Sequence, residues 1–243
     1  LKPFGLEIRQ ERVGCPRALS TRCVVLRTAG RPVATMGQSP PSKAALVVGW
    51  NGAGKTAVVQ RLRGHSSEPL PTTGVLREMA SLQCGPPGEE MELQLELIDV
   101  GSMPKLEAKT ASYQPWLSIA DGVIVVLDAT KTCLRFRPDE VQHSKALLRA
   151  IAMEPEIRDK PILVLANKCD REDALPVAET MEVYELEATL KGRTWQLQRC
   201  SAVTAEGLKP GYAWFINKLL SEAKAPGISG GGLGGSNSGV VIR

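Results

Sequence analysis

The feature that most constrains this chain is the octapeptide Gly-Trp-Asn-Gly-Ala-Gly-Lys-Thr at residues 49–56, which fits the phosphate-binding pattern G-x-x-x-x-G-K-[ST]. Its glycines let backbone N–H groups turn toward a phosphate without interference from a Cβ atom. Lys55 would place a positive charge on the β- and γ-phosphates, and the Thr56 hydroxyl would be a ligand of Mg²⁺. The other residues expected to bind the phosphates are Asn51, Gly52, Ala53 and Gly54.

The residues on either side of this loop support a phosphate site. An apolar run at residues 44–48 is typical of a buried parallel strand, and Val58, Val59 and Leu62 follow the loop at helical spacing. A strand, a glycine-rich turn and the start of a helix together direct helix N–H groups at an anion. The flanking pattern therefore favours a true site over a chance match in a glycine turn.

Composition excludes several other classes. The net charge is +4 on 243 residues, of which 23% are charged, so we expect no nucleic-acid partner. The six cysteines have neither C-x-x-C spacing nor histidine partners suited to zinc, which favours reduced thiols in a cytoplasmic protein. Apolar runs all fall short of the about 18 residues that a membrane span needs.

The chain divides into three parts by composition. Residues 1–42 are rich in Arg and Pro, and we predict a disordered extension there. Residues 43–223 form the predicted globular domain. Residues 224–243 are a Gly/Ser-rich tail, for which disorder is also predicted.

The amino-terminal part leaves attachment to a membrane surface open. Residues 1–35 are either a disordered extension or a stretch joined upstream of a start at Met36. If Met36 is the start, Gly37 is in the place for myristoylation, but Pro41 stands where the motif requires Ser or Thr. A single acyl chain would anchor the protein only marginally.

Within the globular part, strand and helix patterns alternate. The segment at 91–97 alternates apolar and polar residues and is predicted to pair with 75–83 across a turn at 85–88. Continuous apolar runs at 122–127 and 161–166 are typical of central parallel strands covered on both faces. Two helix faces are indicated by Val141, Leu148, Ile151 and Ala152, and by Tyr212, Phe215, Ile216, Leu219 and Leu220. A doubly wound α/β domain follows.

Two further motifs lie at strand ends. Asp99-Val100-Gly101 ends the strand at 93–98, where the Asp99 carboxylate would hold a metal directly or through water. Asn167-Lys168-Cys169-Asp170 ends the strand at 161–166. The Asp170 carboxylate can accept hydrogen bonds from the N1–H and exocyclic amine of guanine, which adenine does not offer. We expect Asn167 to reach the base edge and the loop, and the aliphatic stem of Lys168 to cover the ring.

Across about residues 43–223 the chain resembles the ADP-ribosylation-factor-like branch of the Ras superfamily of small GTPases. The segments that carry the resemblance are Val48-Gly49-Trp50-Asn51-Gly52-Ala53-Gly54-Lys55-Thr56, Pro71-Thr72-Thr73-Gly74, Ile98-Asp99-Val100-Gly101, Asn167-Lys168-Cys169-Asp170 and Cys200-Ser201-Ala202. The resemblance implies a P-loop G domain: a mostly parallel six-stranded sheet with one antiparallel hairpin, and helices on both faces. It implies GTP and GDP as ligands, Mg²⁺ as the metal, and an effector, an exchange factor and an activating protein as partners.

The resemblance also assigns roles to single residues. Thr72 is similar to the first-switch threonine that contacts Mg²⁺ and the γ-phosphate, so the expected metal ligands are Thr56, Thr72 and Asp99. Gly101 is expected beside the nucleotide. Ser201-Ala202 is similar to the last base-contacting loop, whose backbone amide meets the guanine carbonyl oxygen. Tyr113 falls at an aromatic position of the effector surface; the alternative is a tyrosine packed in the core.

The second switch departs from the family pattern. The family continues Asp-Val-Gly with Gly-Gln, whereas this chain has Ser102 and Met103. A thioether cannot orient the attacking water as the glutamine amide does, so Met103 is a degenerate catalytic position beside Lys55 and Thr72. We therefore expect very slow intrinsic GTP hydrolysis, unless a nearby side chain such as Gln114 substitutes.

The function we infer from these residues is a guanine-nucleotide switch, in which GTP and Mg²⁺ order residues around 64–78 and 99–115. The first alternative is a hydrolysis-deficient, GTP-bound scaffold. The second is a P-loop kinase or ATPase, for which Arg135-Phe136-Arg137 would be the candidate lid; the contrary interpretation is a solvated loop. The predicted location is cytoplasmic or peripheral on membranes.

Overall fold

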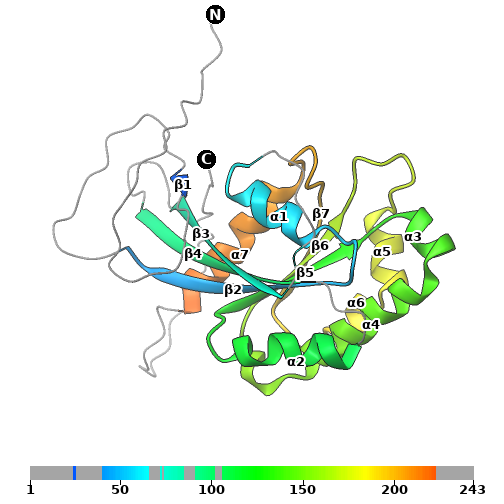
Figure 1. The fold of residues 1–243 in the computed structure, drawn as a ribbon, viewed down its shortest axis with the longest axis horizontal. Coiled ribbons are helices and arrows are strands. Elements are labelled where there is room, and N and C mark those ends of the chain that lie inside the picture. The colour runs from blue at the N-terminus through cyan, green and yellow to red at the C-terminus, as the bar shows by residue number, and fades with distance from the viewer. Residues whose placement is uncertain are drawn as a thin grey trace, which may run out of the picture.

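The computed structural model describes residues 24–25, 40–65, 72, 74–84, 91–101 and 106–222, with only the backbone at 24–25, 106–110 and 222. In this part of the chain, a single sheet has the strand order β1-β3-β4-β2-β5-β6-β7 (Figure 1). The strands are β1 (Val24–Val25), β2 (Ser42–Val48), β3 (Val75–Cys84), β4 (Met91–Val100), β5 (Gly122–Asp128), β6 (Ile162–Asn167) and β7 (Trp195–Arg199).

The predicted six-stranded sheet with one antiparallel hairpin is confirmed in β2 to β7. Strands β3 and β4 pair antiparallel, from Val75 opposite Val100 to Cys84 opposite Met91. The other described pairs are parallel. The sequence analysis missed the two-residue strand β1, which pairs with Ala80 and Ser81 of β3. It was missed because two residues are too few to show a periodic pattern.

Helices cover both faces of the sheet, as Figure 1 shows. They are α1 (Lys55–Leu62), α2 (Leu106–Leu117), α3 (Lys131–Phe136), α4 (Pro138–Met153), α5 (Val177–Val183), α6 (Leu186–Thr189) and α7 (Leu208–Glu222), with a short 3₁₀ turn at Pro155–Ile157. Helices α1 and α7 pack on one face, and α2 to α6 pack on the other.

Alternation along the strands builds a separate core on each face. In β2, Ala45 and Val47 pack with α1 and α7, whereas Leu46 and Val48 pack with α2 and α4. Strands β5 and β6 are buried throughout, which explains their continuous apolar runs. In β4 the three leucines of the predicted alternation are fully buried and the glutamates and glutamine between them are half-buried, whereas Met91 at the start of the strand is exposed.

The parallel strands bring the predicted motifs to one edge of the sheet. The glycine-rich loop follows the carboxyl end of β2, and the Asn167 motif follows that of β6. Asp99 pairs in register with Val47 near the end of β4, so its carboxylate lies close to the same edge. The carboxyl edge of a parallel sheet is where doubly wound proteins bind ligands.

The remaining predictions about the chain can be compared only in part. The described elements of the domain run from Ser42 to Glu222, while most of the predicted disordered segments fall outside the described residues. Cys84, Cys133, Cys169 and Cys200 are free, buried thiols. Among the helices of the described part, none has the length and apolar character to cross a membrane.

Candidate nucleotide and metal site

The loop between β2 and α1 requires glycine for steric reasons. Gly52 has φ 72° and Gly54 has φ 95°, both in the left-handed region. A Cβ on Gly54 would lie 2.4 Å from Asn167 Nδ2, which no relaxation of the loop could accept cheaply. Because Gly54 also caps α1 without a side chain, the N–H groups at the start of this helix are not covered by a capping group. This arrangement suits an anion at the helix N-terminus.

Lys55 contributes a buried positive charge at this helix start. Its side chain is 5% exposed, and Nζ donates a hydrogen bond of 3.2 Å to the Trp50 carbonyl oxygen. Burial lowers the pKa of Lys55, and the negative charge of Asp99 opposes that shift. A phosphate beside Nζ would add negative charge and favour the ammonium form further.

Three oxygen-bearing side chains converge beside Lys55 from separate parts of the chain. Thr56 Oγ1 lies 2.7 Å from Thr72 Oγ1 and donates a 2.7 Å hydrogen bond to Asp99 Oδ2. Thr72 Oγ1 also donates to Asp99 Oδ2, over 3.2 Å. The three residues predicted as metal ligands are therefore in mutual contact.

This donor set fits Mg²⁺. Asp99 is fully buried, and its Oδ1 accepts no hydrogen bond from any described residue. A buried carboxylate oxygen without a donor costs free energy unless a cation or water faces it. Two hydroxyls and one carboxylate are hard oxygen ligands, and Mg²⁺ takes its remaining ligands from water and phosphate. Among the described residues there is no cluster of three or more His, Cys, Asp or Glu side chains that could hold another metal.

Both polar atoms of the Asn167 side chain bind protein groups, and its predicted contact with a base edge stays a prediction. Its side chain is 2% exposed, Nδ2 donates to the Ala53 carbonyl oxygen over 2.8 Å, and Oδ1 accepts from the Ala202 N–H over 3.0 Å. Asn167 joins the phosphate loop to the loop at 201–204, and a guanine carbonyl would have to share the Ala202 N–H with it.

Lys168 is held by an aspartate that the sequence analysis did not single out. Lys168 has φ 73°, and its Nζ lies 2.7 Å from Oδ2 of Asp128. Asp128 is 5% exposed; Arg137 binds the same oxygen over 2.9 Å, and Thr130 donates to Oδ1 over 2.8 Å. The sequence does contain a pattern that points to Asp128, because this residue ends an apolar strand in the same way as Asp99.

The other predicted base-binding residues that remain, Asp170 and Ser201, differ in their exposure and contacts. Asp170 is exposed, and among the described residues no hydrogen bond to its side chain is found, so its carboxylate is open to a ligand. Ser201 is fully buried, and its Oγ accepts the N–H groups of Val203 and Thr204, over 3.1 Å each. Ser201 therefore shapes its own loop.

Gly101 connects the two predicted switch segments. Its N–H donates to the Gly74 carbonyl oxygen over 2.7 Å, and a Cβ at this position would lie 2.5 Å from the Thr72 carbonyl oxygen. The neighbouring residues Ser102 and Met103 lie outside the described residues.

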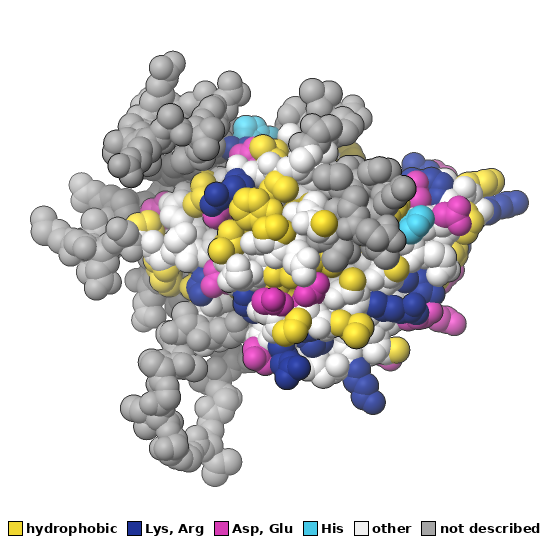
Figure 2. All heavy atoms as spheres, turned by 60° about the horizontal axis from the view of Figure 1, so that its bottom comes forward, with side chains coloured by type: hydrophobic (Ala, Val, Ile, Leu, Met, Phe, Trp, Pro, Cys, Tyr) yellow, Lys and Arg dark blue, Asp and Glu magenta, His cyan; other side chains and the backbone are white. Residues whose placement is uncertain are grey.

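The effector-surface assignment of Tyr113 is wrong. Its side chain is fully buried in the core beneath α2, which agrees with the alternative that was left open. The aromatic ring near the surface is that of Trp116, one turn later, with the Arg77 guanidinium carbon 5.6 Å from its centroid. Arg77 also pairs with Glu96. Figure 2 shows hydrophobic side chains gathered on one face of the molecule, with basic and acidic groups among them.

Two further hypotheses concern Gln114 and the candidate kinase lid. Gln114 is exposed in the last turn of α2, and this helix leads to Asp121, whose N–H donates to the Ala44 carbonyl oxygen at the amino-terminal end of β2. Because Met103 lies outside the described residues, the hypothesis that Gln114 replaces it stays a prediction. In the candidate kinase lid, Arg137 is bound by Asp128 and Glu140.

The fold and site define a P-loop protein in which a buried aspartate, Asp99, lies near the end of β4 and the sequence Asn167-Lys168-Cys169-Asp170 follows at the end of β6. Comparison with known proteins agrees. The model of the ADP-ribosylation factor family matches residues 33–219. The chain belongs to the ADP-ribosylation factor family of small GTPases.

Individual relatives show the same likeness. ADP-ribosylation factor J of Dictyostelium discoideum is 30% identical over 175 residues, covering 72% of this chain and 84% of the relative. ADP-ribosylation factor-like protein 14 of Mus musculus is 29% identical over 187 residues, covering 76% and 90%. Among solved structures, the Arl6 BBS3 small GTPase of Trypanosoma brucei has a TM-score of 0.61 at 18% identity, covering 74% of this chain and 98% of its own.

Thr56→Asn tests the oxygen cluster. The substitution removes one hydroxyl ligand, so we expect GTP affinity measured with Mg²⁺ to fall by about tenfold, and by more than GDP affinity. Lys55→Ala should weaken both nucleotides. Thr189→Asn, the same change on the distant helix α6, serves as the matched control. The site assignment is wrong if chelating Mg²⁺ and Lys55→Ala both leave nucleotide affinity unchanged.

Proposed function

We propose that this protein is a guanine-nucleotide-dependent switch that binds GTP and GDP with Mg²⁺ and hydrolyses GTP very slowly. The observation that carries the proposal is the pair of hydrogen bonds through Asn167, which holds the phosphate loop and the loop at 201–204 together beside Asp170. These two hydrogen bonds would fix a phosphate site and a base site relative to each other.

The phosphate end would be bound by the loop at 49–56. Its N–H groups and Lys55 Nζ would face the β- and γ-phosphates, while Thr56, Thr72 and Asp99 would hold the metal. When bound, Mg²⁺ supplies positive charge to the phosphate oxygens. Because Lys55 is almost fully buried, its charge acts in a medium of low effective dielectric constant.

The base end would be read by Asp170. Its exposed carboxylate is free to accept the N1–H and exocyclic amine of guanine. The stem of Lys168 would cover the ring, and Asp128 would keep that stem in place by binding Nζ. These contacts favour guanine over adenine.

Switching would act through Thr72. The Thr72 hydroxyl is hydrogen-bonded to Thr56 and Asp99. The Gly101 N–H donates to the Gly74 carbonyl oxygen, which joins the two predicted switch segments. With GTP bound, Thr72 would contact the metal and the γ-phosphate; loss of that phosphate would remove the contact and relax residues around 64–78 and 99–115.

One of the solved structures supports nucleotide binding. The Trypanosoma brucei Arl6 protein was solved with a bound nucleotide analogue, GppNp. Effectors, an exchange factor and an activating protein are the classes of partner we propose, with Val75, Arg77 and Trp116 as a surface open to them. We propose a cytoplasmic or peripheral membrane location; Met36 and Gly37 lie outside the described residues.

A hydrolysis-deficient scaffold is the second candidate, and the identity of Met103 favours it. A thioether has no donor and is a weak acceptor, so it does not hold the attacking water. In this form the GTP-bound protein would persist and bind partners without turnover.

The base assignment can be tested with Asp170→Asn. The amide presents a donor where the exocyclic amine needs an acceptor, so we expect GTP affinity to fall by about a hundredfold and XTP affinity to rise relative to GTP. Asp139→Asn in the first turn of α4 is the matched control. Competitive binding of GTP, XTP and ATP measures the effect, and equal affinity of the wild type for ATP and GTP would remove the guanine assignment.

Turnover can be tested with Met103→Gln. Single-turnover hydrolysis of preloaded GTP should be faster in the variant than in the wild type, because the amide can orient the water. A wild type as fast as the variant would show that Met103 does not limit hydrolysis. A wild type with no turnover over many hours would favour the scaffold.

A further inference from the structure

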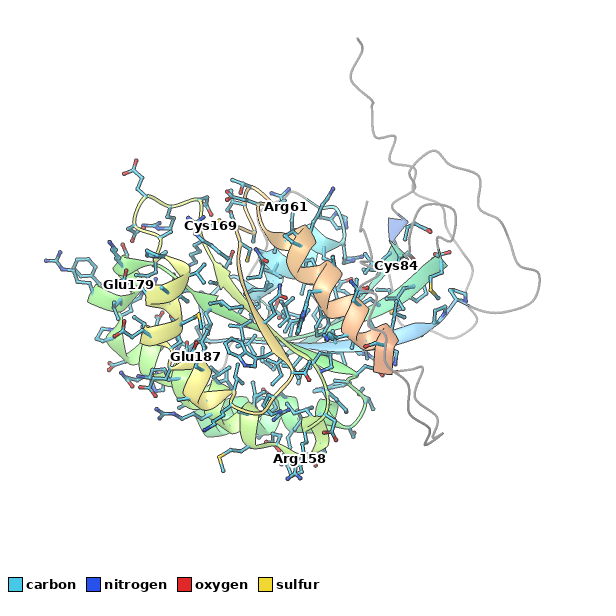
Figure 3. All side chains as sticks on the ribbon, turned by 180° about the vertical axis from the view of Figure 1, so that it is seen from behind. Arg61, Cys84, Arg158, Cys169, Glu179 and Glu187 are labelled. Carbon is cyan, nitrogen blue, oxygen red and sulfur yellow. The ribbon has the colours of Figure 1, made fainter. Side chains whose placement is uncertain are left out.

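We propose that Arg61, in the last turn of α1, is a positioning residue for the base loop, defined here as residues 201–204, and thereby sets how the 6-carbonyl of guanine is read. The inference rests on the proposed guanine-nucleotide function. Arg61 Nε donates to the Ala202 carbonyl oxygen over 2.9 Å, and Nη2 donates to the Val203 carbonyl oxygen. Figure 3 places Arg61 at the same end of the molecule as Cys169 of the base motif.

The N–H groups of the base loop are already engaged within the protein. Ser201 donates to the Glu206 carbonyl oxygen over 2.9 Å, while Val203 and Thr204 donate to Ser201 Oγ. Ala202 donates to Asn167. The carbonyl oxygens of Ala202 and Val203 are the loop groups that Arg61 binds. A planar guanidinium with several N–H donors suits two successive carbonyls, whereas an ammonium is a single point of charge.

The Ala202 residue is therefore held from two directions. Asn167 fixes its N–H, and Arg61 fixes its carbonyl oxygen. Asn167 also binds Ala53 in the phosphate loop, and Arg61 lies on the helix that begins at Lys55 directly after that loop. One restraint on Ala202 thus comes from the residue that binds the phosphate loop, and the other from the last turn of the helix that follows that loop.

This geometry predicts an effect on one part of the base. The Ala202 N–H is the donor expected to meet the 6-carbonyl of guanine, while Asp170 reads the amine edge. Loss of Arg61 would release the peptide group between Ala202 and Val203, and would let the neighbouring Ala202 N–H change direction without changing Asp170. A purely structural role for Arg61 would instead weaken all nucleotides equally.

The experiment compares three nucleotides on the full chain. GDP, 6-thioguanosine diphosphate and inosine diphosphate are competed against a fluorescent GDP on wild type, Arg61→Ala and Arg61→Lys. The thio analogue replaces the 6-carbonyl oxygen with sulfur, a weak acceptor, and the inosine nucleotide lacks only the 2-amino group. The matched control is Arg149→Ala. Arg149 lies on α4, and the substitution breaks its exposed ion pair with Glu185.

We expect Arg61→Ala to reduce the preference for GDP over the thio analogue about tenfold, with the preference for GDP over inosine diphosphate unchanged. Arg61→Lys should be intermediate, and Arg149→Ala should match wild type.

Equal weakening of all three nucleotides, or no change in the thio preference, would overturn the role of Arg61. A wild type that binds GDP over ADP but does not distinguish the thio analogue would also overturn it, while leaving the guanine assignment intact. A wild type without preference for GDP over ADP would overturn the proposed function itself.

Discussion

The site depends above all on the side-chain amide of Asn167. It lies at the end of a fully buried strand and binds one backbone group on each of two loops, Ala53 in the phosphate loop and Ala202 in the base loop. Removing the amide would leave these buried groups without partners, at a cost of about 1–3 kcal/mol each. Neither loop has regular structure to hold it, so Asn167, together with Arg61 on α1, determines how the two loops lie relative to each other.

The electrostatics of the phosphate site depends on two buried side chains of opposite charge. Lys55 and Asp99 are both nearly or fully buried, and each has only part of the polar contact that its charge requires. A phosphate and a divalent cation between them would complete both. The threonine hydroxyls of Thr56 and Thr72 link this charge pair to a segment whose position would depend on the ligand. Binding and switching would thus use the same few oxygen atoms.

Sequence reasoning succeeded where a motif is contiguous. The glycine-rich loop, the Asp99 strand end and the β3–β4 hairpin could be predicted because spacing along the chain determines them. It failed where the partner is remote: Asn167 binds residues 114 positions before it and 35 after it, and Arg61 binds residues 141 and 142 positions away. Tyr113 was misplaced because an aromatic residue in a helix gives no sign of which face it occupies when its neighbours Trp116 and Leu117 are also apolar.

The central claim is that this chain binds a guanine nucleotide. The most direct measurement is to denature the purified protein and identify the released nucleotide by anion-exchange chromatography. The account predicts GDP or GTP in close to equimolar amount, with GDP indicating a cycling switch and GTP the scaffold. Release of an adenine nucleotide, or a protein that carries none and binds neither GDP nor GTP in the presence of Mg²⁺, would contradict it.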